Sequence, residues 1–150
     1  MIDPNVRLAD CHDADDIAQL ELLEREARSA LDGQRGGERW LIEHPEIGAQ
    51  WVERCATDDV WVAYMDDVVV GYMVALLASD LIIRVDQVWV TPAARELGFG
   101  DALLAAVIAN ARDRNGVAVE GQSLPGDRHT KNLYERAGIV ARLITTYKPL

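Results

Sequence analysis

The chain has 150 residues, of which 49% are hydrophobic and 27% charged, and these values favour one globular α/β or α+β domain, spanning 1–150. Its formal net charge of −10 argues against nucleic acid as the main partner. No apolar run approaches the roughly 20 residues of a membrane span, and the N-terminus lacks the apolar core of a signal peptide. The two cysteines fit neither a disulfide framework nor a zinc site, so we expect no metal and a cytoplasmic location.

The acidic residues gather in the N-terminal part of the chain. Residues 1–60 hold 15 Asp and Glu against six Arg, whereas 61–150 hold ten Asp and Glu against nine Lys and Arg. One interpretation is an acidic surface that aids solubility. The other is that this part, with Glu21, Glu24 and Asp32, borders a site for a cationic substrate, while the C-terminal part binds something anionic.

In chain order, the first half of the sequence predicts a short strand and then helices. The strand covers 6–8, and a helix runs from an N-cap at Asp13 to near Gly33. A second helical region covers about 40–54, with an interruption at Pro45 because the residue before proline disfavours the helical backbone. Two β-branched and aromatic runs around Asp66 and Asp67 then predict a hairpin.

The second half of the sequence predicts alternating strands and helices. "LIIRVDQVWV" is a third long strand, and the strongest helix runs from Gly98 to about 115. "VAVEGQ" predicts another strand, a short helix ends at Gly138, and "ARLITTYK" predicts a last strand. No internal repeat or interdomain linker interrupts this order.

Two glycines, Gly98 and Gly100, stand at the start of the strongest helix. The first turn of a helix has amide groups without intrahelical partners and a partly positive dipole. Glycines leave those amides sterically open, which suits a phosphate or pyrophosphate, and Arg95 lies just upstream. The alternative is that the glycines only permit a tight strand-to-helix turn.

Two other nucleotide motifs are excluded by the sequence. No Gly-Lys pair exists for a P-loop, and a dinucleotide fingerprint would need glycine where Leu103 stands. The segment from Gly121 to Ser123 is a near-match to a hydrolase elbow, but the closing glycine falls one place late, at Gly126.

The stretch from Val90 to Gly100, V-T-P-A-A-R-E-L-G-F-G, ends a strand and opens a helix. It resembles the acyl-CoA-binding motif of the GNAT acyltransferase superfamily, V-x-P-x-x-[RQ]-x-x-G-x-[GA]. About 35 residues later, "NLYERAGI" resembles the family's second signature. The order of elements also matches over nearly the whole chain. The resemblance implies a mixed α+β fold in three layers: a mostly antiparallel central sheet of about six or seven strands, with about four helices on both faces.

The resemblance also implies roles for individual residues. Val88 and Val90 would offer backbone groups to the pantetheine arm, and Asp127 occupies a position that contacts it. Tyr134 would be the general acid for the departing thiolate. The pyrophosphate would lie on Arg95 and on the backbone amides of Leu97, Gly98, Phe99, Gly100 and Asp101.

Some residues depart from the family pattern. Glu96 and Leu97 replace small and basic residues, so the loop is less cationic than is typical. Asp127 stands where asparagine is usual, and an ionised carboxylate accepts hydrogen bonds but cannot donate them. Two carboxylates are candidates for the general base. Asp86 is expected on the same face of its strand as Val88 and Val90, and Glu120 lies on the next strand.

These features predict an acetyl-CoA-dependent N-acetyltransferase that acts by direct attack in a ternary complex. The acceptor is a primary amine on a small molecule or a protein, and a homodimer is among the expectations because dimers are frequent in the family. The alternative is a regulatory module that binds acyl-CoA without transfer. The retained Tyr134 favours catalysis, whereas the absence of a clear base favours the module.

Overall fold

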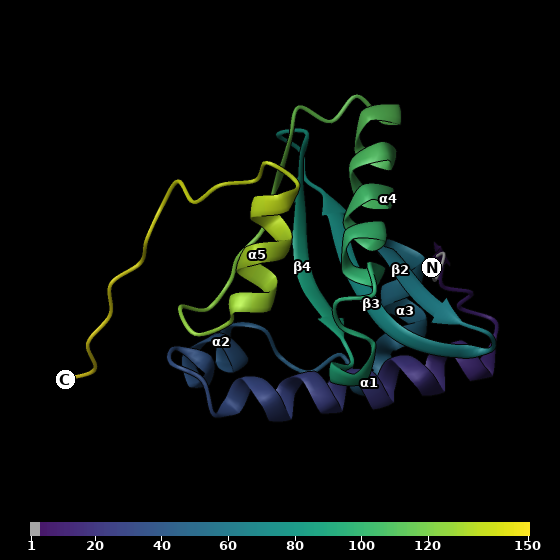
Figure 1. Ribbon diagram of the computed structural model, residues 1–150, viewed down its shortest axis with the longest axis horizontal. Coiled ribbons are helices and arrows are strands. Elements are labelled where there is room, and N and C mark those ends of the chain that lie inside the picture. The colour runs from purple at the N-terminus through teal and green to yellow at the C-terminus, as the bar shows by residue number, and fades with distance from the viewer. Residues whose placement is uncertain (1–3) are drawn as a thin grey trace.

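The computed structural model describes residues 4–150 (Figure 1). The strands are β1 (Asn5–Leu8), β2 (Asp59–Met65), β3 (Val68–Leu77), β4 (Ile82–Val90) and β5 (Ala118–Glu120). The α-helices are α1 (Ala14–Asp32), α2 (Gly37–Glu43), α3 (Trp51–Thr57), α4 (Phe99–Asp113) and α5 (Arg128–Arg136). Two short 3₁₀ helices, Gly48–Gln50 and Pro92–Ala94, complete the secondary structure.

The five strands form one sheet in the order β1-β2-β3-β4-β5. The first four strands pair in antiparallel fashion, and β5 is parallel to β4. Pairing between β4 and β5 is limited to Ile82–Arg84. Beyond Arg84 the two strands separate, so the rest of β4 presents an edge with no neighbouring strand among the described residues.

Helices cover both faces of the sheet (Figure 1). On one face α1 and α3 pack through buried side chains such as Leu20, Leu23 and Trp51. On the other face α4 packs through Phe99 and Leu103, and α5 contributes Tyr134 to the same cluster. Burial of these apolar faces on the sheet is the main favourable contribution to folding.

A β-bulge interrupts β4 at Asp86. Val85 is opposite Ala75 and Gln87 is opposite Val74, which leaves Asp86 as the extra residue. A bulge reverses the alternation of side chains along the strand. Val85 packs with the α4 face, and Asp86 instead contacts Arg54 of α3 on the opposite face.

The predicted elements are confirmed over most of the chain, including the interruption at Pro45 and the mixed, mostly antiparallel sheet. The sheet has five strands rather than six or seven, and five α-helices rather than about four cover it. The last predicted strand is wrong, because residues 141–150 extend away from the body and pair with no strand (Figure 1). Their apolar side chains are exposed, as at Leu143 and Ile144.

None of the helices in residues 4–150 combines the length and the apolar character needed to cross a membrane.

Candidate functional site

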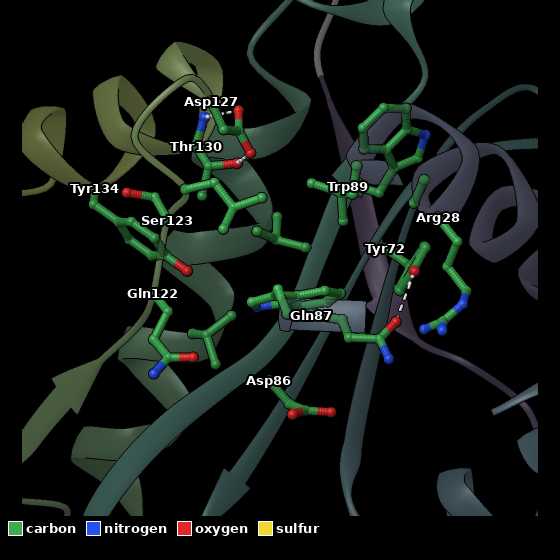
Figure 2. A pocket seen from close by; sticks show the side chains of 16 residues that line it. Arg28, Tyr72, Asp86, Gln87, Trp89, Gln122, Ser123, Asp127, Thr130 and Tyr134 are labelled. Carbon is green, nitrogen blue, oxygen red and sulfur yellow. Dashed lines mark hydrogen bonds between the residues drawn. The ribbon is translucent and has the colours of Figure 1, made fainter. Parts of the chain in front are cut away.

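Two hollows open where β4 and β5 separate. The first, which we call the groove, has a free volume of about 560 Å³ and runs from β4 past the start of α4 to α5. The second, which we call the pocket, is narrower, with about 40 Å³ of free space (Figure 2). The two share Val88, Trp89, Asp127 and Thr130, so they are continuous at the open edge of β4.

The start of α4 borders the groove. Gly98 is the N-cap residue and has a left-handed backbone (φ 89°), which a residue with a Cβ adopts only at a cost. No side chain caps this helix end, and the amides of Phe99, Gly100 and Asp101 have no acceptor within the helix. Gly100 borders α5, because a Cβ added there would lie 3.4 Å from the side chain of Leu133. The arrangement is therefore suited to an anionic group.

The loop before α4 is stabilised by its own arginine. The Nε of Arg95 donates to the carbonyl oxygen of Val90 at 3.0 Å, and its guanidinium lies 4.5 Å from the ring centroid of Trp89. Glu96 is exposed with a left-handed backbone (φ 65°), and Leu97 is exposed as well. The terminal nitrogens of Arg95 have no hydrogen-bond partner among the described residues, so they stay free for a ligand in the groove.

Tyr134 lies in the pocket on α5, and only 6% of its surface is exposed. Its phenol packs directly against the backbone of Gly121, just after β5. A Cβ added at Gly121 would lie 2.4 Å from the Tyr134 hydroxyl oxygen and 2.4 Å from Cζ. Gly121 therefore leaves the space that the phenol occupies, with the hydroxyl directed toward Gln122 (Figure 2).

The environment of Tyr134 favours its neutral form. Burial raises the pKa of the phenol above its usual value of 10, and the nearby carboxylate of Asp127 adds to the increase. The hydroxyl therefore keeps its proton throughout the physiological pH range. It is a hydrogen-bond donor to whatever negative charge develops beside it.

Asp127 is the N-cap of α5. Its Oδ1 accepts from the Thr130 amide at 3.1 Å, and its Oδ2 accepts from the Thr130 hydroxyl at 2.6 Å. The residue lines both the groove and the pocket. Its main contacts within the chain are those of a helix cap, which the sequence analysis did not foresee.

The structure brings one of the two candidate bases to Tyr134. Asp86 lines the pocket, where its Oδ2 lies 2.5 Å from a terminal nitrogen of Arg54 and its Oδ1 lies 3.9 Å from the Nε2 of His44. Glu120 is exposed, pairs with Arg84 at 3.4 Å and lines neither hollow. The parity argument for Asp86 was wrong, because the bulge places it on the opposite face from Val88 and Val90.

The pocket is completed by residues to which the sequence analysis assigned no role. Arg28 of α1, Gln87 of β4, and Gln122 and Ser123 after β5 all line the pocket, with Trp40 of α2. The Tyr72 hydroxyl donates to Gln87 at 2.9 Å in the buried floor. No local motif marks these residues, since they come from four separate segments.

The acidic residues expected to face a cationic substrate lie elsewhere. Glu24 is buried and accepts from the amides of Ile47 and Gly48 at 2.9 and 2.8 Å, so it fixes the loop after α2. Neither Glu21 nor Asp32 lines the pocket. Within residues 4–150, no three His, Cys, Asp or Glu side chains form a group that could hold a metal ion.

Comparison with known proteins places this geometry in context. A sequence-family model described as the acetyltransferase (GNAT) domain matches residues 56–138. No curated protein matches the chain in sequence.

Similar solved structures share the fold at low identity. An aminoglycoside acetyltransferase from an uncultured soil metagenomic sample has a TM-score of 0.71 and 15% identity, over 98% of this chain and 96% of that one. The ribosomal-protein-alanine N-acetyltransferase from Brucella melitensis biovar Abortus 2308 has a TM-score of 0.67 and 18% identity, over 99% of both chains. AAC(6')-Iy, solved with a CoA-containing bisubstrate analogue, has a TM-score of 0.67 and 16% identity, over 99% of this chain and 100% of that one.

Proposed function

Because this chain belongs to the GNAT acetyltransferase family, as its two motifs predicted, we propose that it transfers an acetyl group from acetyl-CoA to a primary amine bound in the pocket. The observation that carries the proposal is the continuity of two hollows along the unpaired edge of β4. The groove ends at the uncapped start of α4, and the pocket holds the buried Tyr134.

The residues of the groove fit the acetyl donor. We assign the pyrophosphate to the amides from Leu97 to Asp101, with Arg95 beside them, because these donors have no competing acceptor in the described chain. Val88 and Val90 lie on the stretch of β4 that pairs with β3 on one side and has no strand on the other, where the pantetheine arm would lie as an added strand. The donor supplies the activated acetyl group, and the protein orients it toward the pocket.

Two side chains of the pocket are proposed to handle protons. The acceptor amine attacks as a neutral nitrogen, so its ammonium form must first lose a proton. Asp86 is proposed to accept that proton, directly or through water, since the other pocket carboxylate, Asp127, caps α5. Tyr134 is proposed to donate a hydrogen bond, and then its proton, to the departing sulfur, and to regain a proton from the one that the attacking nitrogen releases as the amide forms.

The class of acceptor is proposed from the residues of the pocket and from the solved proteins that share the fold. The named relatives act on aminoglycosides or on a ribosomal-protein alanine, so both small-molecule and protein amines are candidates. The alternative, an acyl-CoA-binding module without transfer, differs from our proposal in one measurable property. It binds acetyl-CoA and releases no thiol with any amine.

Two experiments test the proposal. Calorimetry with acetyl-CoA tests the groove, and absence of binding at millimolar concentration would reject both the enzyme and the module. Release of free CoA thiol with a broad amine panel tests transfer. We expect release with at least one amine, together with the acetylated product by mass spectrometry. Tight binding without release from any amine would support the module instead.

A further inference from the structure

Arg28 stands out among the pocket residues because its charge is not balanced by a carboxylate. Its Nη1 donates to the His44 carbonyl oxygen at 2.7 Å and its Nη2 to the Leu41 carbonyl oxygen at 3.3 Å. No salt bridge joins Arg28 to any described residue, whereas the pocket carboxylate Asp86 is paired with Arg54. The pocket thus contains one cation with no ion-pair partner.

The two carbonyl contacts leave part of the guanidinium free. A guanidinium has five N–H donors in one plane, and the two bonds to Leu41 and His44 fix its orientation. A guanidinium whose orientation is fixed in this way can donate two parallel hydrogen bonds to the two oxygens of a carboxylate. A half-buried cation also gains from an anion at its side, because solvent does not fully hydrate it.

The position of Arg28 in the pocket relates it to the reacting groups. Figure 2 shows Tyr134 and Gln122 on one side of the pocket and Arg28 with Gln87 on the other, with Asp86 below and between them. An acceptor that spans the pocket therefore meets Tyr134 near one end and the guanidinium at the other. Asp86 lies between these two ends and can take the proton of an ammonium, whereas Arg28 at the far end offers the opposite charge to an anion.

The size of the pocket limits the acceptor. Its free space of about 40 Å³ corresponds to about three water molecules. Even alanine, with six non-hydrogen atoms, is larger than three water molecules, and the rings of an aminoglycoside exceed this space much further. The pocket therefore favours the smallest acceptors. The aromatic side chain of Trp40 and the side chain of Leu124 line the pocket as well, and they restrict it further.

Resting on the acetyl transfer proposed above, we infer that the acceptor is a small amino acid whose carboxylate is bound by the Arg28 guanidinium while its amine reacts beside Asp86 and Tyr134. Arg28 is thus a specificity-determining residue. The protein's net charge of −10 would by itself favour a more cationic acceptor, so a preference for the zwitterion must come from the local site.

The test compares each acid with its own carboxamide. L-alanine, β-alanine and 4-aminobutanoate are each assayed beside the corresponding amide by thiol release with saturating acetyl-CoA. We expect kcat/KM for the best acid to exceed that of its amide on the order of 10-fold or more, as expected for a charge-assisted hydrogen bond. In Arg28→Gln this preference falls to about one, through a rise in KM for the acid.

Two controls separate recognition from a structural role. A purely structural Arg28, which only holds the end of α2, would affect acid and amide equally. Arg25→Gln, an exposed arginine on the same helix, should leave the preference unchanged. Arg28→Lys retains the charge but cannot donate two parallel hydrogen bonds. We therefore expect its preference for the acid over the amide to lie between those of the wild type and Arg28→Gln. The wild-type comparison stands even if Arg28→Gln does not fold.

The outcomes are distinguishable from failure of the proposed function. Turnover with amides, aminoglycosides or peptide N-termini in preference to acids would overturn this inference and leave acetyl transfer intact. An acid preference that survives in Arg28→Gln would overturn it as well. Acetyl-CoA binding without turnover on any amine would reject the proposed function itself.

Discussion

Gly121→Ala is expected to displace the candidate acid, Tyr134, without changing its side chain. The new methyl carbon would lie 2.4 Å from the Tyr134 hydroxyl oxygen and from Cζ, against an ordinary contact distance of at least 3.4 Å. The phenol must therefore move by about 1 Å. Gly121 has no left-handed backbone, so the alanine causes no backbone strain of its own.

A displacement of this size is expected to affect turnover far more than donor binding. A misplacement of about 1 Å at a reacting group costs on the order of 100-fold in rate, so we expect kcat to fall by about that factor. The acetyl-CoA dissociation constant should stay within about 3-fold, because the groove residues around α4 are unchanged. Steady-state thiol release and calorimetry give the two numbers.

The matched control is Gly33→Ala. A Cβ at Gly33 meets no atom within 4 Å, so this variant carries the same chemical change without the clash. In the Tyr134→Phe background, Gly121→Ala should cost at most about 3-fold more, because both changes act on one hydroxyl. Wild-type kcat in Gly121→Ala, or a full 100-fold additional loss in the Phe background, would refute the reasoning.

Three further predictions follow from other features. Gly98→Ala forces a residue with a Cβ into the left-handed backbone region, which costs about 1–2 kcal/mol of folding free energy. Compared with Gly33→Ala, this variant should be less stable in urea unfolding and should bind acetyl-CoA more weakly in calorimetry. Unchanged affinity would remove the start of α4 from the donor site. Because the pKa of Tyr134 is raised, ionisation of its phenol should cause no loss of kcat between pH 8 and 10. A tyrosinate absorbance transition of Tyr134 within that range would contradict this prediction. Hydrogen bonds from Arg7 lower the pKa of Asp16, so the stabilising contribution of this carboxylate is present above about pH 4 and is lost as pH falls further. Asp16→Asn should therefore lower the unfolding free energy at pH 7 by about 1.5–3 kcal/mol. The variant should also lose less stability than the wild type as pH falls below about 4.

The elements of the fold were predictable because each has a strong local signal. Asp13 does cap α1, and its side chain accepts from the Asp15 amide as the N-cap pattern implies. The segment 141–148 has strand-forming residues, but a strand also requires a neighbouring edge, which sequence composition does not reveal. For the same reason the number of strands was overestimated.

The groove residues at the start of α4 and Tyr134 of the pocket were predictable, whereas most of the other pocket residues were not. Gly98 and Tyr134 belong to contiguous motifs whose spacing has a direct chemical meaning. Arg28 lies more than 90 residues before Tyr134, and only the packing of α1 against the sheet brings it to the pocket. The bulge at Asp86 does leave a local trace that the sequence analysis did not use, because Asp86 and Gln87 are consecutive polar residues and interrupt the alternation in "RVDQV".

The most direct test of the account is the activity of Tyr134→Phe. The account predicts that kcat for thiol release falls on the order of 10²- to 10⁴-fold, the usual contribution of a general acid, while acetyl-CoA binds as tightly as to the wild type. Phenylalanine keeps the ring in the space beside Gly121, so folding should be unaffected. Wild-type turnover in this variant would contradict the account.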